Sequence, residues 1–165
     1  MNNWKVAWGL ATKPIIIAFV LIALRFVAEA LEWPNWAANI FGVSWLVFLL
    51  PIYFALEILK SKREKPFLLL VQTTLVFALP VRLVVAASYS LAYHFQWQAS
   101  RFQIASGGVV PGPNDDPMTP LQGYLAVPAA NFLFGVITAV AIAAIIGGII
   151  ILVKGKKSET AEAGD

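Results

Sequence analysis

Residues 125–153 read LAVPAANFLFGVITAVAIAAIIGGIIILV, without a charged side chain. A helix needs about 20 mostly apolar residues to cross a bilayer, and this run is long enough. Three further apolar runs, at residues 14–31, 38–59 and 66–92, approach or reach the same length. Lipid offers no hydrogen-bond partner to an open backbone, so each run must be helical. The sequence therefore predicts an all-α integral membrane protein with four transmembrane helices.

The composition excludes several other classes of protein. Hydrophobic residues make up 59% of the 165 residues and charged residues 13%, against about 45–50% and about 25% in a soluble domain. A chain this short cannot hide so much apolar surface in a soluble core, which excludes an ordinary soluble domain, a disordered chain and a nucleic-acid-binding protein. The chain has no cysteine and one histidine, which excludes iron–sulfur clusters, thiolate metal sites and bis-histidine haem. We expect no cofactor, no metal site and no catalytic residue.

Basic residues are distributed unevenly between the two sets of loops. One set comprises the N-terminal segment, the loop between the second and third runs and the C-terminal segment, and the other set carries only Arg101. The first set carries Lys5, Lys13, Lys60, Lys62, Arg63, Lys65, Lys154, Lys156 and Lys157. The positive-inside rule then places both termini in the cytoplasm. Because the loops are short and cysteine is absent, we expect the inner (plasma) membrane of a bacterium.

We expect a single four-helix membrane domain at residues 1–157, with an extracytoplasmic loop at 93–123 and a disordered cytoplasmic tail at 158–165. Glycine and proline mark the loop, and small polar residues mark the tail. Ala28-Glu29-Ala30 has the small-x-small form of a signal-peptide cleavage site. Charged Arg25 and Glu29 interrupt the apolar run at that boundary, so we expect the first span to be retained.

Short motifs recur in the same order in the two halves of the chain. Lys13-Pro14 opens the first span and Lys65-Pro66 the third, and each span later carries one arginine, Arg25 or Arg82. The second span opens with AANIFGV at 37–43, and the fourth contains AAN at 129–131 and FGV at 134–136. These matches suggest two parallel helical-hairpin repeats related by a pseudo-two-fold axis along the membrane normal. Coincidence within a small apolar alphabet is the alternative.

Ionisable residues inside the spans are the main candidates for a site. Arg25 and Glu29 are four residues apart and share a helix face, and the helix rise places Glu29 and Arg82 at a matching depth of about 24–25 Å. We expect Arg25 and Arg82 to flank Glu29, with Asn39 and Asn131 capping the outer ends of the second and fourth spans. One interpretation is a site for an anionic group, such as a lipid phosphate, a quinone headgroup or a small organic anion. The other is a buried ion pair with a second arginine that extends outward.

Other polar groups have simpler interpretations. We expect Glu57 and Lys60 to form a solvated pair. Gln72, Thr73 and Thr74 are expected to make helix-to-helix hydrogen bonds, or, for the threonines, bonds back to the backbone. His94 is expected to be an ordinary interfacial residue, although a single imidazole is able to bind a metal or a chlorin. Asn114-Asp115-Asp116 lacks the further spaced ligands of a calcium loop and predicts a turn.

The fourth span carries a small residue at every fourth position. This stripe consists of Gly135, Ala139, Ala143 and Gly147. Small residues let another backbone approach closely. The stripe therefore predicts tight helix packing, either against the second span or against another protein.

The sequence suggests two functions. The first is a small non-catalytic accessory subunit of a larger membrane complex, with other integral membrane subunits and lipids as partners. It rests on the small size, the lack of a soluble domain and the small-residue stripe. The second is a small carrier, or a lipid-, quinone- or anion-binding protein, that acts as a homo-oligomer. An intramembrane enzyme is disfavoured, because Glu29 and His94 are the only plausible proton-transfer groups.

Overall fold

The computed structural model describes residues 3–61 and 64–162, and 82% of the chain is helical. Four segments of the described chain are long and apolar enough to cross a membrane: Asn3–Ala30, Asn35–Lys60, Pro66–Phe95 and Gln122–Lys154. This confirms the predicted all-helical fold with four helices of spanning length. The elements are α1 (Asn3–Ala30), α2 (Asn35–Ile40), η1 (Val43–Trp45), α3 (Leu46–Lys60), α4 (Pro66–Phe95), η2 (Ser100–Phe102), η3 (Ile104–Ser106), the π-helix η4 (Gln122–Ala126) and α5 (Val127–Glu162).

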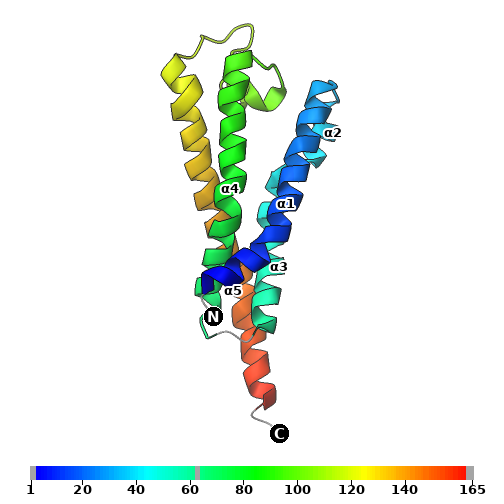
Figure 1. The fold of residues 1–165 in the computed structure, drawn as a ribbon, viewed down its shortest axis with the longest axis vertical. Coiled ribbons are helices and arrows are strands. Elements are labelled where there is room, and N and C mark those ends of the chain that lie inside the picture. The colour runs from blue at the N-terminus through cyan, green and yellow to red at the C-terminus, as the bar shows by residue number, and fades with distance from the viewer. Residues whose placement is uncertain (1–2, 62–63, 163–165) are drawn as a thin grey trace.

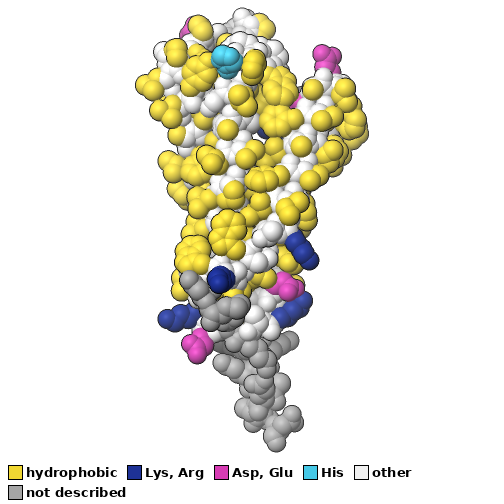
Figure 2. Space-filling view, viewed as in Figure 1, with side chains coloured by type: hydrophobic (Ala, Val, Ile, Leu, Met, Phe, Trp, Pro, Cys, Tyr) yellow, Lys and Arg dark blue, Asp and Glu magenta, His cyan; other side chains and the backbone are white. Residues whose placement is uncertain are grey.

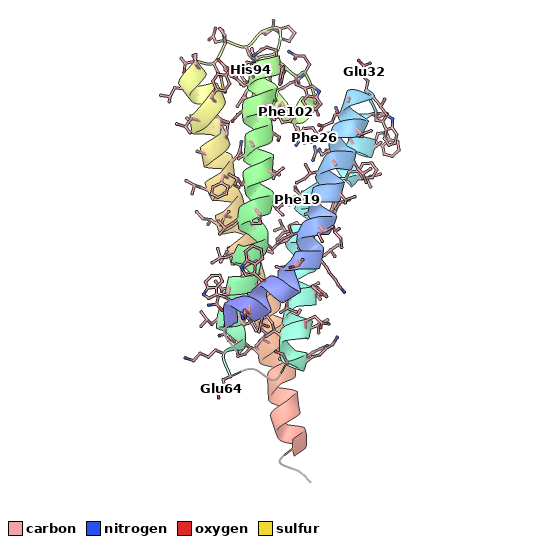
Figure 3. All side chains as sticks on the ribbon, in the orientation of Figure 1. Phe19, Phe26, Glu32, Glu64, His94 and Phe102 are labelled. Atoms are coloured by element: carbon pink, nitrogen blue, oxygen red, sulfur yellow. The ribbon has the colours of Figure 1, made fainter. Side chains whose placement is uncertain are left out.

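The long helices run side by side, and both chain ends lie at the same end of the molecule (Figure 1). We call it the lysine end, because basic side chains among the described residues gather there (Figure 2). The opposite end holds the segment between α4 and α5 and is called the loop end. It carries the single histidine, His94 (Figure 3).

Helix α1 begins well before the predicted boundary at residue 14. Ala7 and Ala11 are fully buried, so the segment before Pro14 packs into the core. Pro14 was expected near a helix start but lies inside α1. A proline within a helix removes one backbone hydrogen bond and bends the helix, and Figure 1 shows α1 bent across the lysine end. Pro66, by contrast, lies in the first turn of α4 as predicted.

The second span was expected to be one helix from 38 to 59, but it is interrupted near its loop end. Helix α2 ends at Ile40, and the backbone of Gly42 is extended, with φ −68° and ψ 126°. A Cβ added at Gly42 would lie 3.0 Å from the carbonyl oxygen of Asn39 and 3.1 Å from Nη1 of Arg25. The interruption therefore makes room for an arginine from the neighbouring helix.

Helix α5 extends beyond the predicted span at its C-terminal end. The tail expected to be disordered from residue 158 is helical through Glu162, and residues 163–165 lie outside the described part of the chain. Lengthening an existing helix avoids the cost of nucleation. Glutamate and alanine also have favourable helix propensity, which accounts for the difference.

The surface between the two ends is apolar, as Figure 2 shows. Large hydrophobic side chains are exposed along the helices: Phe134 is 73% exposed, Ile137 65% and Leu83 61%. The core consists mainly of small and branched residues, together with Phe54 and Phe77. Such a distribution suits a bundle surrounded by hydrocarbon rather than by water.

The small-residue stripe of α5 is occupied within the chain itself. A Cβ added at Gly147 would lie 2.8 Å from the Leu70 side chain of α4 and 3.1 Å from the carbonyl oxygen of Pro51 in α3. Ala139 and Ala143 are buried, and Gly135 faces the side chain of Arg82. The stripe therefore packs α5 against α3 and α4 and does not argue for a second protein.

We expect Gly147→Ala to destabilise the bundle by about 1–3 kcal/mol, because the new methyl group overpacks the junction of α3, α4 and α5. Gly9→Ala is the matched control, since a Cβ there meets nothing within 4 Å. That control should stabilise α1 by up to about 1 kcal/mol. Equilibrium unfolding in detergent micelles measures both. Equal effects of the two substitutions would contradict the packing assigned to the stripe.

Candidate functional site

The candidate site is built around Glu29, near the loop end of α1. Its Oε1 accepts a hydrogen bond from Nε of Arg25 at 3.0 Å, across one turn of the same helix. The predicted Arg25–Glu29 pair is therefore present. The side chain of Glu29 is only 7% exposed and that of Arg25 18% exposed. Two ionised groups are thus held largely away from solvent near one end of a membrane-spanning helix.

The second arginine beside Glu29 is Arg101, not the predicted Arg82. Nη2 of Arg101 donates to Oε2 of Glu29 at 2.9 Å, and its Nε lies 2.8 Å from Oε1. The segment after α4 folds back over α1, which brings a loop residue to a residue 72 positions earlier in the chain. Depth along the helices matched Arg82 to Glu29, but depth alone carries no information about which faces meet.

Aromatic rings hold Arg101 in place. Its guanidinium carbon lies 4.1 Å from the ring centroid of Phe102 and 4.8 Å from that of Phe26. Phe26 also stacks on Trp97, with the ring centroids 5.2 Å apart, and Figure 3 shows Phe26 and Phe102 between α1 and α4. Burial lowers the pKa of Arg101, and the charge of Glu29 opposes that change. An arginine pKa is high enough that the side chain remains a cation.

The cluster of Arg25, Glu29 and Arg101 has a net charge of +1 and is extended by Asn39. Oδ1 of Asn39 accepts a hydrogen bond from Nη2 of Arg25 at 2.9 Å. The prediction that Asn39 and Asn131 cap helix ends is wrong, because each lies inside a helix, α2 or α5. Asn39 instead orients Arg25. The guanidinium is thus held on two sides, by Glu29 and by Asn39.

A cavity of about 270 Å³ opens beside Arg25. Its walls are Arg25, Trp36, Asn39, Ile40, Gly42, Ser44 and Trp45. Trp36 is 71% exposed and Trp45 64% exposed, so the mouth of the cavity lies on the outer surface of the bundle. Nη1 of Arg25 makes no hydrogen bond to any described residue, and it lies beside Gly42 in this wall. The cavity therefore joins a cationic donor to an aromatic rim.

A second hollow, of about 440 Å³, lies on the other side of the cluster. It is lined by Glu29, Glu32, Trp33, Asn35, Trp97, Gln98, Ala99, Ser100 and Gln103. Both carboxylate oxygens of Glu29 already contact arginine nitrogens. Ser100 donates to Oδ1 of Asn35 at 2.9 Å. The Ser100–Asn35 bond joins the loop to α2.

Arg82 lies apart from the cluster, between α4 and α5. Its Cδ and Nε are each 2.7 Å from the position that a Cβ on Gly135 would occupy. In the described part of the chain, no hydrogen bond or ion pair involves Arg82. Nδ2 of Asn131, one turn from Gly135 on α5, is buried and has no hydrogen-bond partner among the described residues. Two of the predicted site residues therefore lie on a different helix pair from Arg25 and Glu29.

The remaining polar candidates have local roles. His94 Nδ1 is 2.8 Å from the hydroxyl of Tyr124, and Asp115 accepts from the backbone of Gly112 in a turn. Glu57 and Lys60 form the predicted exposed pair, and Thr73 and Thr74 donate to backbone carbonyls one turn earlier. Within residues 3–61 and 64–162, no group of three acidic, histidine or cysteine side chains is arranged to hold a metal ion.

Comparison with known proteins finds no match, since no family model, no curated protein and no solved structure corresponds to this chain. The site must therefore be interpreted from its own geometry. Sequence reasoning missed Arg101 and Gly42 as parts of it. One sequence feature could have identified Arg101: it is the only lysine or arginine in the two connections at the loop end. The feature at Gly42 is weaker, because it is only that a glycine interrupts an apolar run.

We expect Glu29→Gln to destabilise the protein by about 3–5 kcal/mol, because it leaves two largely buried guanidinium groups without a carboxylate. Glu57→Gln is the control, since it removes a carboxylate from an exposed pair in which Lys60 is 71% exposed. The control should cost less than about 1 kcal/mol. Equilibrium unfolding of the purified protein measures both values. A loss of stability in Glu29→Gln as small as that in the control would show that the cluster does not hold the loop end together.

Proposed function

We propose that this protein is a non-catalytic membrane protein that binds the phosphate of an anionic lipid at the cavity beside Arg25. The observation that carries the proposal is the guanidinium of Arg25 in the wall of that cavity. The cluster around it has a net charge of +1, and its one carboxylate is shared between two arginines. An anionic ligand would neutralise this charge.

The level of Arg25 in the membrane supports a lipid rather than a soluble ligand. Twelve residues separate Arg25 from Lys13, so its backbone lies about 18 Å above the lysine end. Arginine side chains extend outward toward the polar headgroups. In a hydrocarbon core about 30 Å thick, this places Arg25 in the leaflet at the loop end, about 12 Å below the surface of that core.

The chemistry of the cavity suits a phosphate with attached acyl chains. Arginine binds phosphate oxygens through two parallel N–H groups, and Ser44 adds a hydroxyl to the same cavity. Trp36, Ile40 and Trp45 provide apolar contact for the lipid body at the open side.

We also propose that both termini are cytoplasmic and that the protein resides in a bacterial inner membrane. The unequal distribution of basic residues supports this orientation. The loop end then faces the extracytoplasmic side, and the bound lipid belongs to the outer leaflet. If the protein carries the lipid across the membrane rather than only binding it, we expect it to act as a homo-oligomer, because four spans enclose little space for transport.

The accessory-subunit function is the second candidate. It is supported by the small size of the chain and by the broad exposed apolar surface of α5, which includes Leu133, Phe134 and Ile137. The stripe of small residues no longer supports it, because α3 and α4 occupy that stripe within the chain. Lipid alone is sufficient to cover the exposed face of α5.

Ser44→Phe is expected to lower the affinity for phosphatidylglycerol by about tenfold or more, because its ring fills the cavity and leaves the Arg25–Glu29–Arg101 cluster intact. Arg25→Gln should have the same effect by removing a charge-assisted hydrogen bond worth about 1.5–3 kcal/mol. Lys65→Gln, which changes the net charge equally at the other end, is the control. Native mass spectrometry of protein titrated with phosphatidylglycerol in a mild detergent measures how much of the lipid each variant retains.

Retention by Ser44→Phe equal to the wild type would contradict the proposed cavity. Competition by inorganic phosphate alone would show that the ligand is a soluble anion. A second protein chain that co-purifies at fixed stoichiometry from the native membrane, with no retained lipid, would favour the accessory subunit.

A further inference from the structure

The two halves of the chain place an arginine against a glycine in the same way. Nη1 of Arg25 lies 3.1 Å from the position of a Cβ on Gly42, and Nε of Arg82 lies 2.7 Å from that of a Cβ on Gly135. The arginine belongs to the first long helix of its half, α1 or α4. The glycine belongs to the segment that returns, α2–α3 or α5. In both halves, only a residue without a side chain leaves room for the guanidinium.

An asparagine accompanies each contact, just before the glycine in the sequence. Asn39 precedes Gly42 by three residues and accepts from Arg25. Asn131 precedes Gly135 by four residues, so it lies one turn away on the same face of α5. Its Nδ2 is buried without a partner among the described residues. The second half thus presents an arginine and an amide donor toward the same part of the interface between α4 and α5.

The halves differ in the compensating charge. Glu29 follows Arg25 by four residues and pairs with it, whereas Ala86 stands four residues after Arg82. No carboxylate in the described part of the chain pairs with Arg82. A cation within a span is costly unless it is paired or extends to the headgroups. An unpaired cation beside an unpaired amide donor is suited to an acceptor from outside the chain.

The level of Arg82 indicates where that acceptor comes from. Arg82 is sixteen residues from Pro66, so its backbone lies about 24 Å above the lysine end. Its guanidinium therefore lies in the same leaflet as that of Arg25, about 6 Å nearer the headgroup layer. The acceptors that fill this layer are lipid phosphates.

We propose that Arg82, Asn131 and the notch at Gly135 form a second lipid-phosphate site, the counterpart of the cavity beside Arg25. The chain then holds two anionic lipids in the leaflet at the loop end, one in each half. The site stands on its own residues and shares only the class of ligand with the proposed function.

Native mass spectrometry of protein reconstituted in phosphatidylcholine nanodiscs with added phosphatidylglycerol, then released into detergent, counts the retained anionic lipids. We expect two on the wild type, one on Arg82→Gln, one on Arg25→Gln and none on the double variant. Gly135→Ala tests the site without changing any charge, because the new Cβ displaces the guanidinium. It should also retain one lipid. Gly9→Ala, whose Cβ meets nothing within 4 Å, should retain two.

Two lipids on both Arg82→Gln and Gly135→Ala would overturn the proposal. So would a second protein chain that is bound to the wild type and lost from Arg82→Gln, because a carboxylate of that partner would then be the acceptor. Loss of one lipid from Arg82→Gln and Gly135→Ala, with no change in Arg25→Gln, would retain the second site and reject the proposed function at the first. Gly135→Ala keeps the test available if Arg82→Gln fails to fold.

Discussion

One carboxylate holds the loop end together. Glu29 pairs with Arg25 on its own helix and with Arg101 from the segment after α4, and each of the three side chains is less than a fifth exposed. The ion pair acts together with the apolar cluster around Phe102, in which Phe26 of α1 stacks on Trp97. Because Glu29 is shared, neither arginine is fully neutralised. The same interaction that closes the fold therefore leaves positive charge beside a cavity.

The four long helices are built as expected for a bundle surrounded by hydrocarbon. Apolar side chains face outward along the helices, and the core between them is built largely from alanine, glycine and branched residues. Close backbone approach takes the place of a large hydrophobic core. Glycine has a second use at the loop end, where it makes room for guanidinium groups instead of for another helix. Glycine thus serves helix packing at Gly147 and makes room for arginine side chains at Gly42 and Gly135.

The candidate site was only partly predictable. The Arg25–Glu29 pair follows from four-residue spacing on one helix, which needs no knowledge of other elements. Arg101 did not follow, because its contact with Glu29 depends on how a long loop folds back. Arg82 was placed beside the wrong partner, because a matching depth leaves the rotation of each helix undetermined. Neither asparagine caps a helix: Asn39 orients Arg25, and Nδ2 of Asn131 has no hydrogen-bond partner among the described residues.

The sequence by itself determined the number of spans, their helical state and the uneven distribution of basic residues, because length, hydropathy and backbone hydrogen bonding in lipid are properties of local segments. Only the tertiary structure decided that α5 packs its small residues within the chain, that Gly42 interrupts the second span and that Arg101 completes the cluster. Each of these depends on which helix faces meet, and a sequence pattern along one helix does not specify its neighbours.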